Sequence, residues 1–180
     1  MLDSQPPLSP GQLIGERYRL VRSLSTGTQG RLWLATDQLD ADAPVVLRRV
    51  AAGQPELQQQ LRQVWPRLQG LLHPQLPRFG ELIAEGGAAD QDVALWLPRQ
   101  WQEGRSYAAL LAARAERQLV FGAAEVLLLL RQLLPVLTLL HGQGLVHGDL
   151  SPANLLRRER DGLPVLLDFG LVRGTEEAAA

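Results

Sequence analysis

Three oxygen-bearing side chains lie in two short segments of the chain, residues 147–156 (HGDLSPANLL) and 167–170 (LDFG). Transfer of a phosphoryl group needs a carboxylate that orients the attacking hydroxyl, and oxygen ligands that hold Mg²⁺ on the phosphates. Mg²⁺ prefers hard oxygen donors and keeps several waters, so two or three protein side chains suffice. Asp149, Asn154 and Asp168 supply such a set. The two segments therefore favour magnesium-dependent phosphoryl transfer.

A glycine-bearing turn in the N-terminal half indicates a phosphate-binding loop. Residues 24–30 (LSTGTQG) lie between two segments that are typical of β-strands, 17–21 and 32–35. Glycine lets a backbone approach phosphates closely and direct amide groups at them. Residues 44–50 (PVVLRRV) predict a further strand, in which alternation places Val46 and Arg48 on one face.

These segments resemble protein kinases. Residues 147–154 are similar to the catalytic loop H-R-D-x-x-x-x-N and residues 168–170 to D-F-G, while residues 17–37 resemble the opening of bacterial serine/threonine kinase domains. The resemblance spans residues 17–172 and implies ATP and Mg²⁺ as cofactors. It implies that Asp149 is the catalytic base and that Asn154 and Asp168 are the magnesium ligands. The nucleotide-binding residues that it implies are Leu24, Ser25, Gly27, Gly30, Leu32, Val46, Arg48 and Leu156.

Four positions depart from the kinase pattern. Arg48 replaces the lysine that grips the phosphates, and its longer, planar guanidinium is not expected to reproduce that grip. Val64 falls where the family has the helix glutamate that pairs with this lysine. On the catalytic loop, Ser151 replaces the lysine that steadies the transferring phosphate, and Gly148 replaces an arginine that meets a phosphorylated activation loop. We therefore expect impaired catalysis in which Asp149, Arg48 and Ser151 are the catalytic positions.

Three functions remain open at this point. The first is a serine/threonine protein kinase domain that transfers phosphate from Mg-ATP to protein hydroxyls with impaired activity. The second is a pseudokinase, a regulatory or binding module on the same scaffold. The third is a small-molecule phosphotransferase of the aminoglycoside-kinase type, whose loop also has glycine before the aspartate. Either of the first two implies a protein substrate or a regulatory protein partner.

The expected fold is α+β and protein-kinase-like, in three parts. Residues 1–16 are expected to form a flexible leader. Residues 17–101 are expected to form a lobe with a five-stranded antiparallel sheet and one helix, whose apolar stripe begins near residue 55 and which Pro66 should kink or shorten. Residues 102–180 are expected to form part of a helical lobe, with a mostly buried helix over 123–142 and a small hairpin over 155–167.

Composition and termini set further expectations. The formal net charge is −1, which does not favour nucleic acid as a partner, and the lack of cysteine excludes disulfides and thiolate zinc sites. Residues 126–140 are too few for a membrane span, and the N-terminus does not resemble a signal peptide, so we expect a cytoplasmic chain without a membrane span. Kinases continue well beyond D-F-G, so we also expect the leucine-rich helix to expose an apolar patch. The isolated chain is then expected either to be poorly soluble or to be a fragment of a longer protein.

Overall fold

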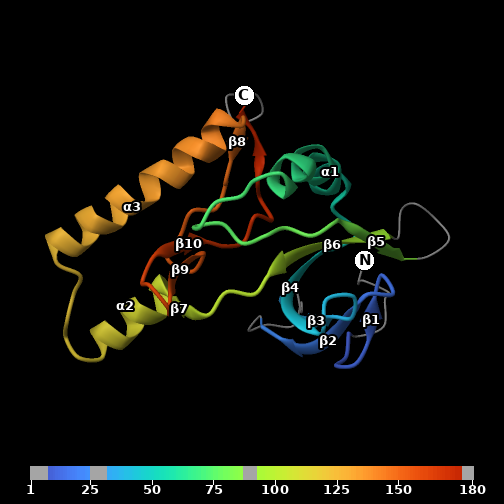
Figure 1. Ribbon diagram of the computed structural model, residues 1–180, viewed down its shortest axis with the longest axis horizontal. Helices are drawn as coiled ribbons and strands as arrows, with labels where there is room; N and C mark the ends of the chain where they lie inside the picture. The colour runs from blue at the N-terminus through green and yellow to red at the C-terminus, as the bar shows by residue number, and fades with distance from the viewer. Residues whose placement is uncertain (1–7, 25–31, 87–92, 176–180) are drawn as a thin grey trace. The chain divides into compact units, whose positions relative to one another are not determined.

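The computed structural model describes residues 8–24, 32–86 and 93–175. The chain divides into two compact units. The first unit contains Met1–Gln69 and Arg78–Trp101, and the second contains Gly70–Pro77 and Gln102–Ala180. A sheet with one helix dominates the first unit, and the second combines two helices with short strands (Figure 1). The α+β class predicted from the sequence is confirmed.

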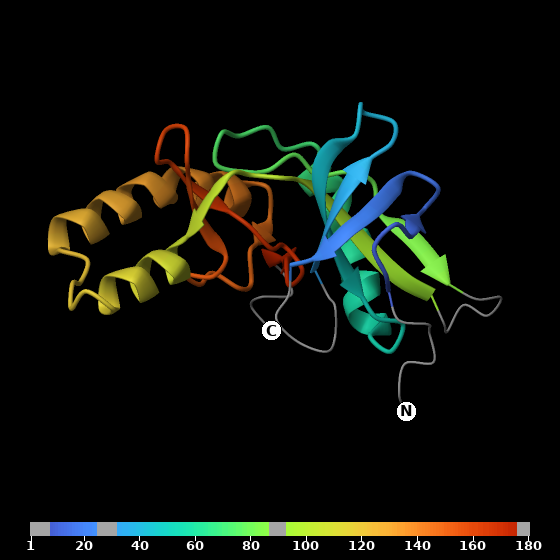
Figure 2. The ribbon, with the colours of Figure 1, turned by 90° about the horizontal axis from the view of Figure 1, so that it is seen from below.

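The sheet of the first unit is antiparallel throughout and has the strand order β1-β2-β3-β4-β6-β5. Its strands can be followed from blue to yellow-green in Figure 2. The five predicted strands are present, and a sixth, β1, adds an edge that the sequence did not predict. The bounds are β1 Leu13–Ile14, β2 Tyr18–Ser23, β3 Leu32–Asp37, β4 Ala43–Val50, β5 Ile83–Gly86 and β6 Val93–Gln100.

The extra strand corrects the prediction of a flexible leader over residues 1–16 where it concerns residues 8–16, while residues 1–7 lie outside the described residues. Ile14 in β1 is fully buried, and Leu8 packs against the same core cluster. The segment from residue 8 onward is therefore part of the folded unit, because burial of an apolar side chain there stabilises its backbone. A strand of two residues is too short for an alternation pattern to reveal it.

Helix α1, Pro55–Gln69, belongs to the first unit and buries one of its faces. It continues through Pro66 to Gln69, so the predicted shortening did not occur. The Trp65 indole Nε1 donates a hydrogen bond to the Gly80 carbonyl at 2.8 Å. The Gln58 amide donates to the Ala51 and Val93 carbonyls at 3.0 and 2.9 Å. These bonds fix the rotation of the helix and keep Val64 on its buried face, where it is 3% exposed.

The second unit contains two helices, a three-stranded sheet of order β10-β9-β7 and a two-stranded sheet of β11 and β8. The predicted hairpin is confirmed, because β9 pairs antiparallel with β10. Ser106 caps the first helix, its side chain accepting a hydrogen bond from the Ala109 amide. The bounds are α2 Tyr107–Ala115, α3 Ala123–Gly142, β7 Gly104–Ser106, β8 Leu145–Val146, β9 Leu155–Arg158, β10 Pro164–Leu166 and β11 Arg173–Gly174.

Helix α3 has the predicted bounds but not the predicted burial. Leu133, Val136 and Leu140 are its buried residues, whereas Leu127 and Leu134 are 65% and 59% exposed. The expected apolar patch is therefore present. At 20 residues, α3 is long and apolar enough to cross a membrane by length and composition alone. The length argument from residues 126–140 was wrong, because the helix extends beyond that stretch at both ends.

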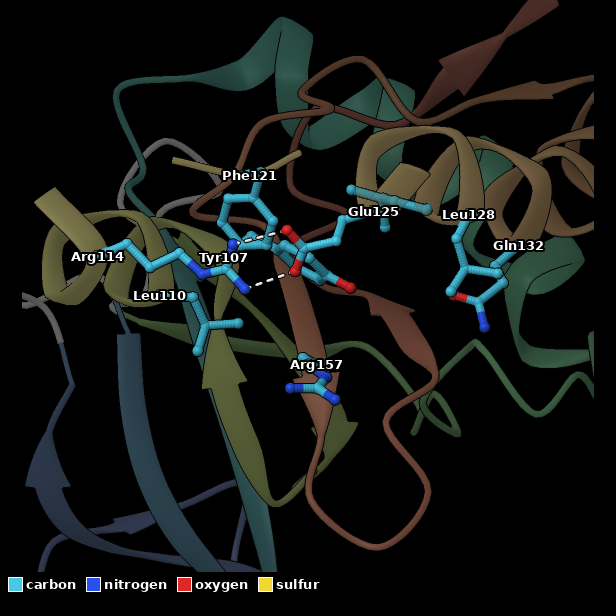
Figure 3. A pocket seen from close by; sticks show the side chains of 9 residues that line it. Tyr107, Leu110, Arg114, Phe121, Glu125, Leu128, Gln132 and Arg157 are labelled. Carbon is cyan, nitrogen blue, oxygen red and sulfur yellow. Dashed lines mark hydrogen bonds and ion pairs between the residues drawn. The ribbon is translucent and has the colours of Figure 1, made fainter. Parts of the chain in front are cut away.

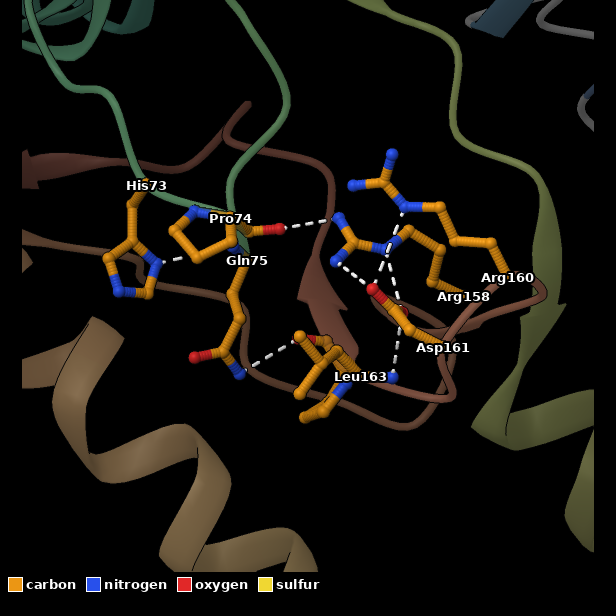
Figure 4. Close-up of polar contacts among 8 residues, drawn as sticks. His73, Pro74, Gln75, Arg158, Arg160, Asp161 and Leu163 are labelled. Carbon is orange, nitrogen blue, oxygen red and sulfur yellow. Dashed lines mark hydrogen bonds and ion pairs between the residues drawn. The ribbon is translucent and has the colours of Figure 1, made fainter.

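Within the second unit, residues 70–77 are held to the rest of the unit by Gln75, which is almost fully buried. Its amide nitrogen donates to the Gln132 and Pro164 carbonyls, both at 2.9 Å. Its own carbonyl accepts a hydrogen bond from the Leu166 amide at 3.0 Å. The His73 ring nitrogen Nδ1 accepts a hydrogen bond from the Gln75 amide at 3.2 Å, so this histidine has a structural role in the turn (Figure 4).

A second anchor of the same segment is the buried side chain of Arg158. Its guanidinium donates to the Pro74 carbonyl at 2.6 Å and forms a two-point contact with the Asp161 carboxylate at 2.9 and 2.6 Å (Figure 4). Hydrogen bonding from Arg158 lowers the pKa of Asp161 to about 2. The turn between β9 and β10 thus positions the arginine that holds Pro74.

Candidate active site

The catalytic-loop residues Asp149 and Asn154 are in direct contact. The Asn154 amide nitrogen donates to the Asp149 backbone carbonyl at 2.9 Å and to its carboxylate oxygen Oδ2 at 2.8 Å. The Asn154 backbone amide closes a turn on the Ser151 carbonyl at 3.0 Å. Because its Nδ2 serves Asp149, the asparagine retains its Oδ1 as the atom that can ligate a cation.

The hairpin β9–β10 brings Asp168 beside this loop. Leu155 pairs with Leu166, so the residues that flank the pair, Asn154 and Leu167, meet at the end of the ladder. The Leu167 amide donates to the Asn154 carbonyl at 2.8 Å. Asp168 follows with a φ of 58°, and its Oδ1 accepts the Gly170 amide at 3.3 Å. Two segments that are separate in sequence therefore place Asp149, Asn154 and Asp168 in one neighbourhood.

His147 connects the catalytic loop to the segment that contains D-F-G. Its side chain is buried, and its ring meets that of Phe169 edge-on with centroids 4.5 Å apart. Nε2 bonds the Leu167 carbonyl at 2.9 Å, and Nδ1 accepts the Asp149 amide at 3.3 Å. This pair of bonds requires the neutral ring with its proton on Nε2. Burial lowers the pKa of His147, against smaller raising effects from the Leu167 carbonyl, Asp168 and Asp149.

We expect the stability of the chain to decrease as the pH falls below about 6.5, the pKa of an unfolded histidine. The unfolded state then binds a proton that folded His147 resists, so protonation favours unfolding, and the loss is complete below the folded pKa. Urea unfolding across this pH range should show a flatter profile for His147→Asn than for the wild type. Thr138→Ser, at an exposed and non-ionisable position of α3, is the matched control and should leave the profile unchanged. An unaltered profile in His147→Asn would contradict the assignment.

Gly148 occupies a backbone position that other residues rarely adopt. Its φ is 80°, and a Cβ atom built there would lie 2.2 Å from the Leu171 carbonyl oxygen. The sequence showed that glycine replaces the arginine of the kinase pattern. It gave no sign that the loop passes so close to the backbone after D-F-G. The glycine is therefore a steric requirement of this loop.

The donor set fits a partly hydrated magnesium ion. Within residues 8–24, 32–86 and 93–175, no cluster of three or more His, Cys, Asp or Glu side chains is arranged to hold a metal. Asp168 and the Asn154 oxygen offer hard oxygen donors, which Mg²⁺ accepts when waters and phosphate oxygens complete its coordination. The residues present therefore suit a cation that arrives with a nucleotide better than a permanently bound one.

The remaining predicted nucleotide residues lie partly outside the described residues. Ser25, Gly27 and Gly30 are among those not described. In the first unit, Leu32 pairs with Arg48 across β3 and β4, and the Leu24 amide donates to the Leu32 carbonyl at 2.8 Å. Their neighbour Val46 is fully buried. In the second unit, Leu156 is buried in β9 and Ser151 is half-buried on the catalytic loop.

Comparison with solved structures identifies the fold. The chain superposes on the kinase domain of PknI from Mycobacterium tuberculosis with a TM-score of 0.74 and 22% identity, over 92% of this chain and 64% of that one. The chain has a protein-kinase fold. Sequence relatives agree: it is 38% identical over 165 residues to the serine/threonine-protein kinase-like protein E of Synechocystis, which covers 91% of this chain. It is 30% identical to the serine/threonine-protein kinase PknA of Nostoc over 90% of this chain.

The similarity to bacterial serine/threonine kinases predicted from the sequence is thus confirmed. The chain spans 26% and 28% of the lengths of these two relatives, and 62% of the probable serine/threonine-protein kinase YbdM of Bacillus subtilis, to which it is 29% identical. No protein-family model matches the chain.

Within this kinase-like fold, two supporting residues were not singled out from the sequence. Leu167 contributes its backbone amide to Asn154 and its carbonyl to His147, and Phe169 packs on the histidine ring. Phe169 belongs to the D-F-G motif, so its position in the motif was an available signal. Leu167 acts through its backbone, which its residue type does not reveal.

Proposed function

We propose that the chain binds Mg-ATP and transfers its terminal phosphoryl group to hydroxyls of a protein substrate at a reduced rate. The observation that carries this proposal is the set of hydrogen bonds that joins Asp149, Asn154 and Leu167 and so places Asp168 beside the catalytic loop. The similarity to serine/threonine kinases favours a protein hydroxyl over a small alcohol as acceptor. A cytoplasmic location is part of the same proposal.

In this mechanism the chain's own residues position the reactants. The Asn154 amide orients the Asp149 carboxylate, which would accept the proton of the attacking hydroxyl. Neutral His147 holds the Asp149 amide and the Leu167 carbonyl, so it keeps the two segments in register. Asn154 and Asp168 would hold the magnesium ion. Bound Mg-ATP supplies the phosphoryl group and the positive charge that offsets charge developing during transfer.

A second candidate, a nucleotide-binding regulatory module without transfer, is favoured by Val64. This residue lies on the buried face of α1, so the helix presents an apolar side chain where the kinase pattern has a glutamate. Together with Arg48 and Ser151, it removes groups that stabilise the transition state. Loss of one such electrostatic group costs roughly 10²–10³ in rate. The reduced rate in the first candidate and the absence of transfer in the second follow from the same substitutions.

Binding is tested by thermal unfolding of the chain with and without Mg-ATP. A hundredfold excess of ligand over its dissociation constant should stabilise the chain by about 2.7 kcal/mol and raise its melting temperature. Asp168→Asn, which removes a carboxylate ligand, should lose most of this increase. Glu116→Gln, an exposed change after α2, is the matched control and should keep it. A wild-type melting temperature that does not respond to millimolar Mg-ATP would overturn both candidates.

A further inference from the structure

Two arginines face each other across the short sheet of the second unit. Arg105 in β7 and Arg157 in β9 occupy directly opposed register positions, and both are exposed. Like charges at opposed positions of an antiparallel pair destabilise it. Among the described residues, neither side chain has a hydrogen bond or ion pair to a protein group. The nearby Glu125 carboxylate attracts Arg157 electrostatically, but both of its oxygens are already bound by Arg114. Among the described residues, the repulsion between Arg105 and Arg157 is therefore not offset by an ion pair to either arginine.

The two strands are held close at this point. Gly104 has a φ of 154°, and a Cβ atom at its position would lie 2.3 Å from the Arg157 carbonyl oxygen. The Arg157 guanidinium lies over the β9–β10 turn, 3.5 Å from the place of a Cβ on Gly162. The backbone thus fixes where the two arginine side chains begin, at directly opposed positions of the strand pair.

The pair borders a recess of about 600 Å³ that is positively charged. Its lining includes four arginines, at 105, 157, 158 and 160, and two carboxylates, Glu159 and Asp161. Asp161 is engaged by Arg158, so it does not neutralise the Arg105–Arg157 pair. None of Asp149, Asn154 and Asp168 lines this recess. Its charge therefore suits an anionic group that is separate from the proposed reaction.

Arg157 also borders a second recess, of about 150 Å³, between α2, α3 and β9 (Figure 3). Its walls include Tyr107, Leu110 and Phe121. The charged pair in it is internally satisfied, because Arg114 binds the Glu125 carboxylate at two points and stacks 3.9 Å over the Phe121 ring. Figure 3 shows this pair above Leu110, with Arg157 below and joined to neither partner. A space of this size holds a benzene-sized apolar group.

We propose that this surface binds an acidic peptide segment of a partner protein. A carboxylate or phosphate of the peptide lies between Arg105 and Arg157, and a neighbouring apolar side chain enters the recess beside Leu110. An oxyanion there removes the repulsion between the arginines, and guanidinium groups bind carboxylate and phosphate at two points. Charge complementarity selects an acidic partner and disfavours a basic one. The shared border at Arg157 explains why the anionic and apolar groups must be adjacent in the peptide.

The test is fluorescence anisotropy of three labelled decapeptides with the purified chain. One carries Glu-Glu-Leu at its centre, one phosphoserine-Glu-Leu, and one Lys-Lys-Leu. The first two should bind, more weakly as salt rises, and the third should not. Arg105→Gln and Arg157→Gln should each raise the dissociation constant about tenfold, the loss expected for one charge-assisted contact. Arg62→Gln, an exposed change on α1, is the matched control.

Thermal unfolding separates this role from a structural one. Because both substitutions remove repulsion, neither should lower the melting temperature in the absence of peptide. Unchanged peptide affinity in Arg157→Gln, or a lowered melting temperature with no peptide binding by the wild type, would overturn the proposal. Tighter binding of the phosphoserine peptide would assign the anion as phosphate, and equal binding would assign it as carboxylate. Binding of inorganic phosphate alone, with neither acidic peptide, would refute a peptide ligand.

Discussion

Gly148→Ala is expected to lower the free energy of unfolding by about 3 kcal/mol, since a positive φ and a backbone clash each cost roughly 1–3 kcal/mol. The added methyl group would lie 2.2 Å from the Leu171 carbonyl oxygen. The loop has little freedom to move away, because His147 on one side bonds the Leu167 carbonyl and Val172 beyond Leu171 is fully buried. The strain must therefore appear as lost stability or as a displaced catalytic loop.

Urea unfolding of Gly148→Ala and of Gly142→Ala measures this effect. A Cβ at Gly142, in the last turn of α3, meets nothing within 4 Å. The control should therefore be neutral or gain up to about 1 kcal/mol, the helix preference of alanine over glycine. Gly148→Arg, which restores the kinase-pattern residue, should be no more stable than Gly148→Ala. Wild-type stability in Gly148→Ala would show that the loop relaxes freely and that the glycine is not a steric requirement.

Periodic patterns in the sequence were enough to predict most of the elements. Alternation in residues 17–21 anticipated β2, in which Tyr18 and Leu20 are buried and the residue that follows each of them is exposed. The stripe of Leu61, Val64 and Leu68 anticipated the buried face of α1. The hydrophobic pattern did not predict the burial of α3, because apolar residues occur on all sides of this helix. Such a composition is typical of a buried helix, yet it does not state which neighbours cover each side.

The site was predicted as a set of residues but not as a set of contacts. Motif spacing identified Asp149, Asn154 and Asp168, while their adjacency depends on the pairing of Leu155 with Leu166. Contacts made by backbone groups, such as the Leu167 amide and carbonyl, could not be predicted, because every residue type except proline carries the same backbone groups. The positive φ of Gly148 is likewise a property of the folded loop. The sequence thus predicts which residues could take part in phosphoryl transfer, and the β9–β10 hairpin determines how they lie relative to one another.

Asp149→Asn is expected to reduce phosphoryl transfer by about 10²–10⁴, the usual contribution of a general base. The substitution keeps the shape of the side chain but removes its capacity to accept the hydroxyl proton. It also places an amide opposite the Asn154 Nδ2, which now donates to the Asp149 carboxylate at 2.8 Å. The measurement is transfer from radiolabelled ATP to a general protein substrate and to the chain itself, for the wild type, Asp149→Asn and the control Glu116→Gln.

The pattern of results distinguishes the candidate functions, because binding and transfer depend on different residues. Phosphoryl transfer that is lost in Asp149→Asn but kept in Glu116→Gln supports a kinase. The thermal shift with Mg-ATP should still occur in Asp149→Asn, since Asn154 and Asp168 remain. A thermal shift without transfer in the wild type would instead assign the regulatory module, with Arg48, Val64 and Ser151 as the cause. Transfer that persists undiminished in Asp149→Asn would contradict the role of this carboxylate as base, even though Asn154 orients it.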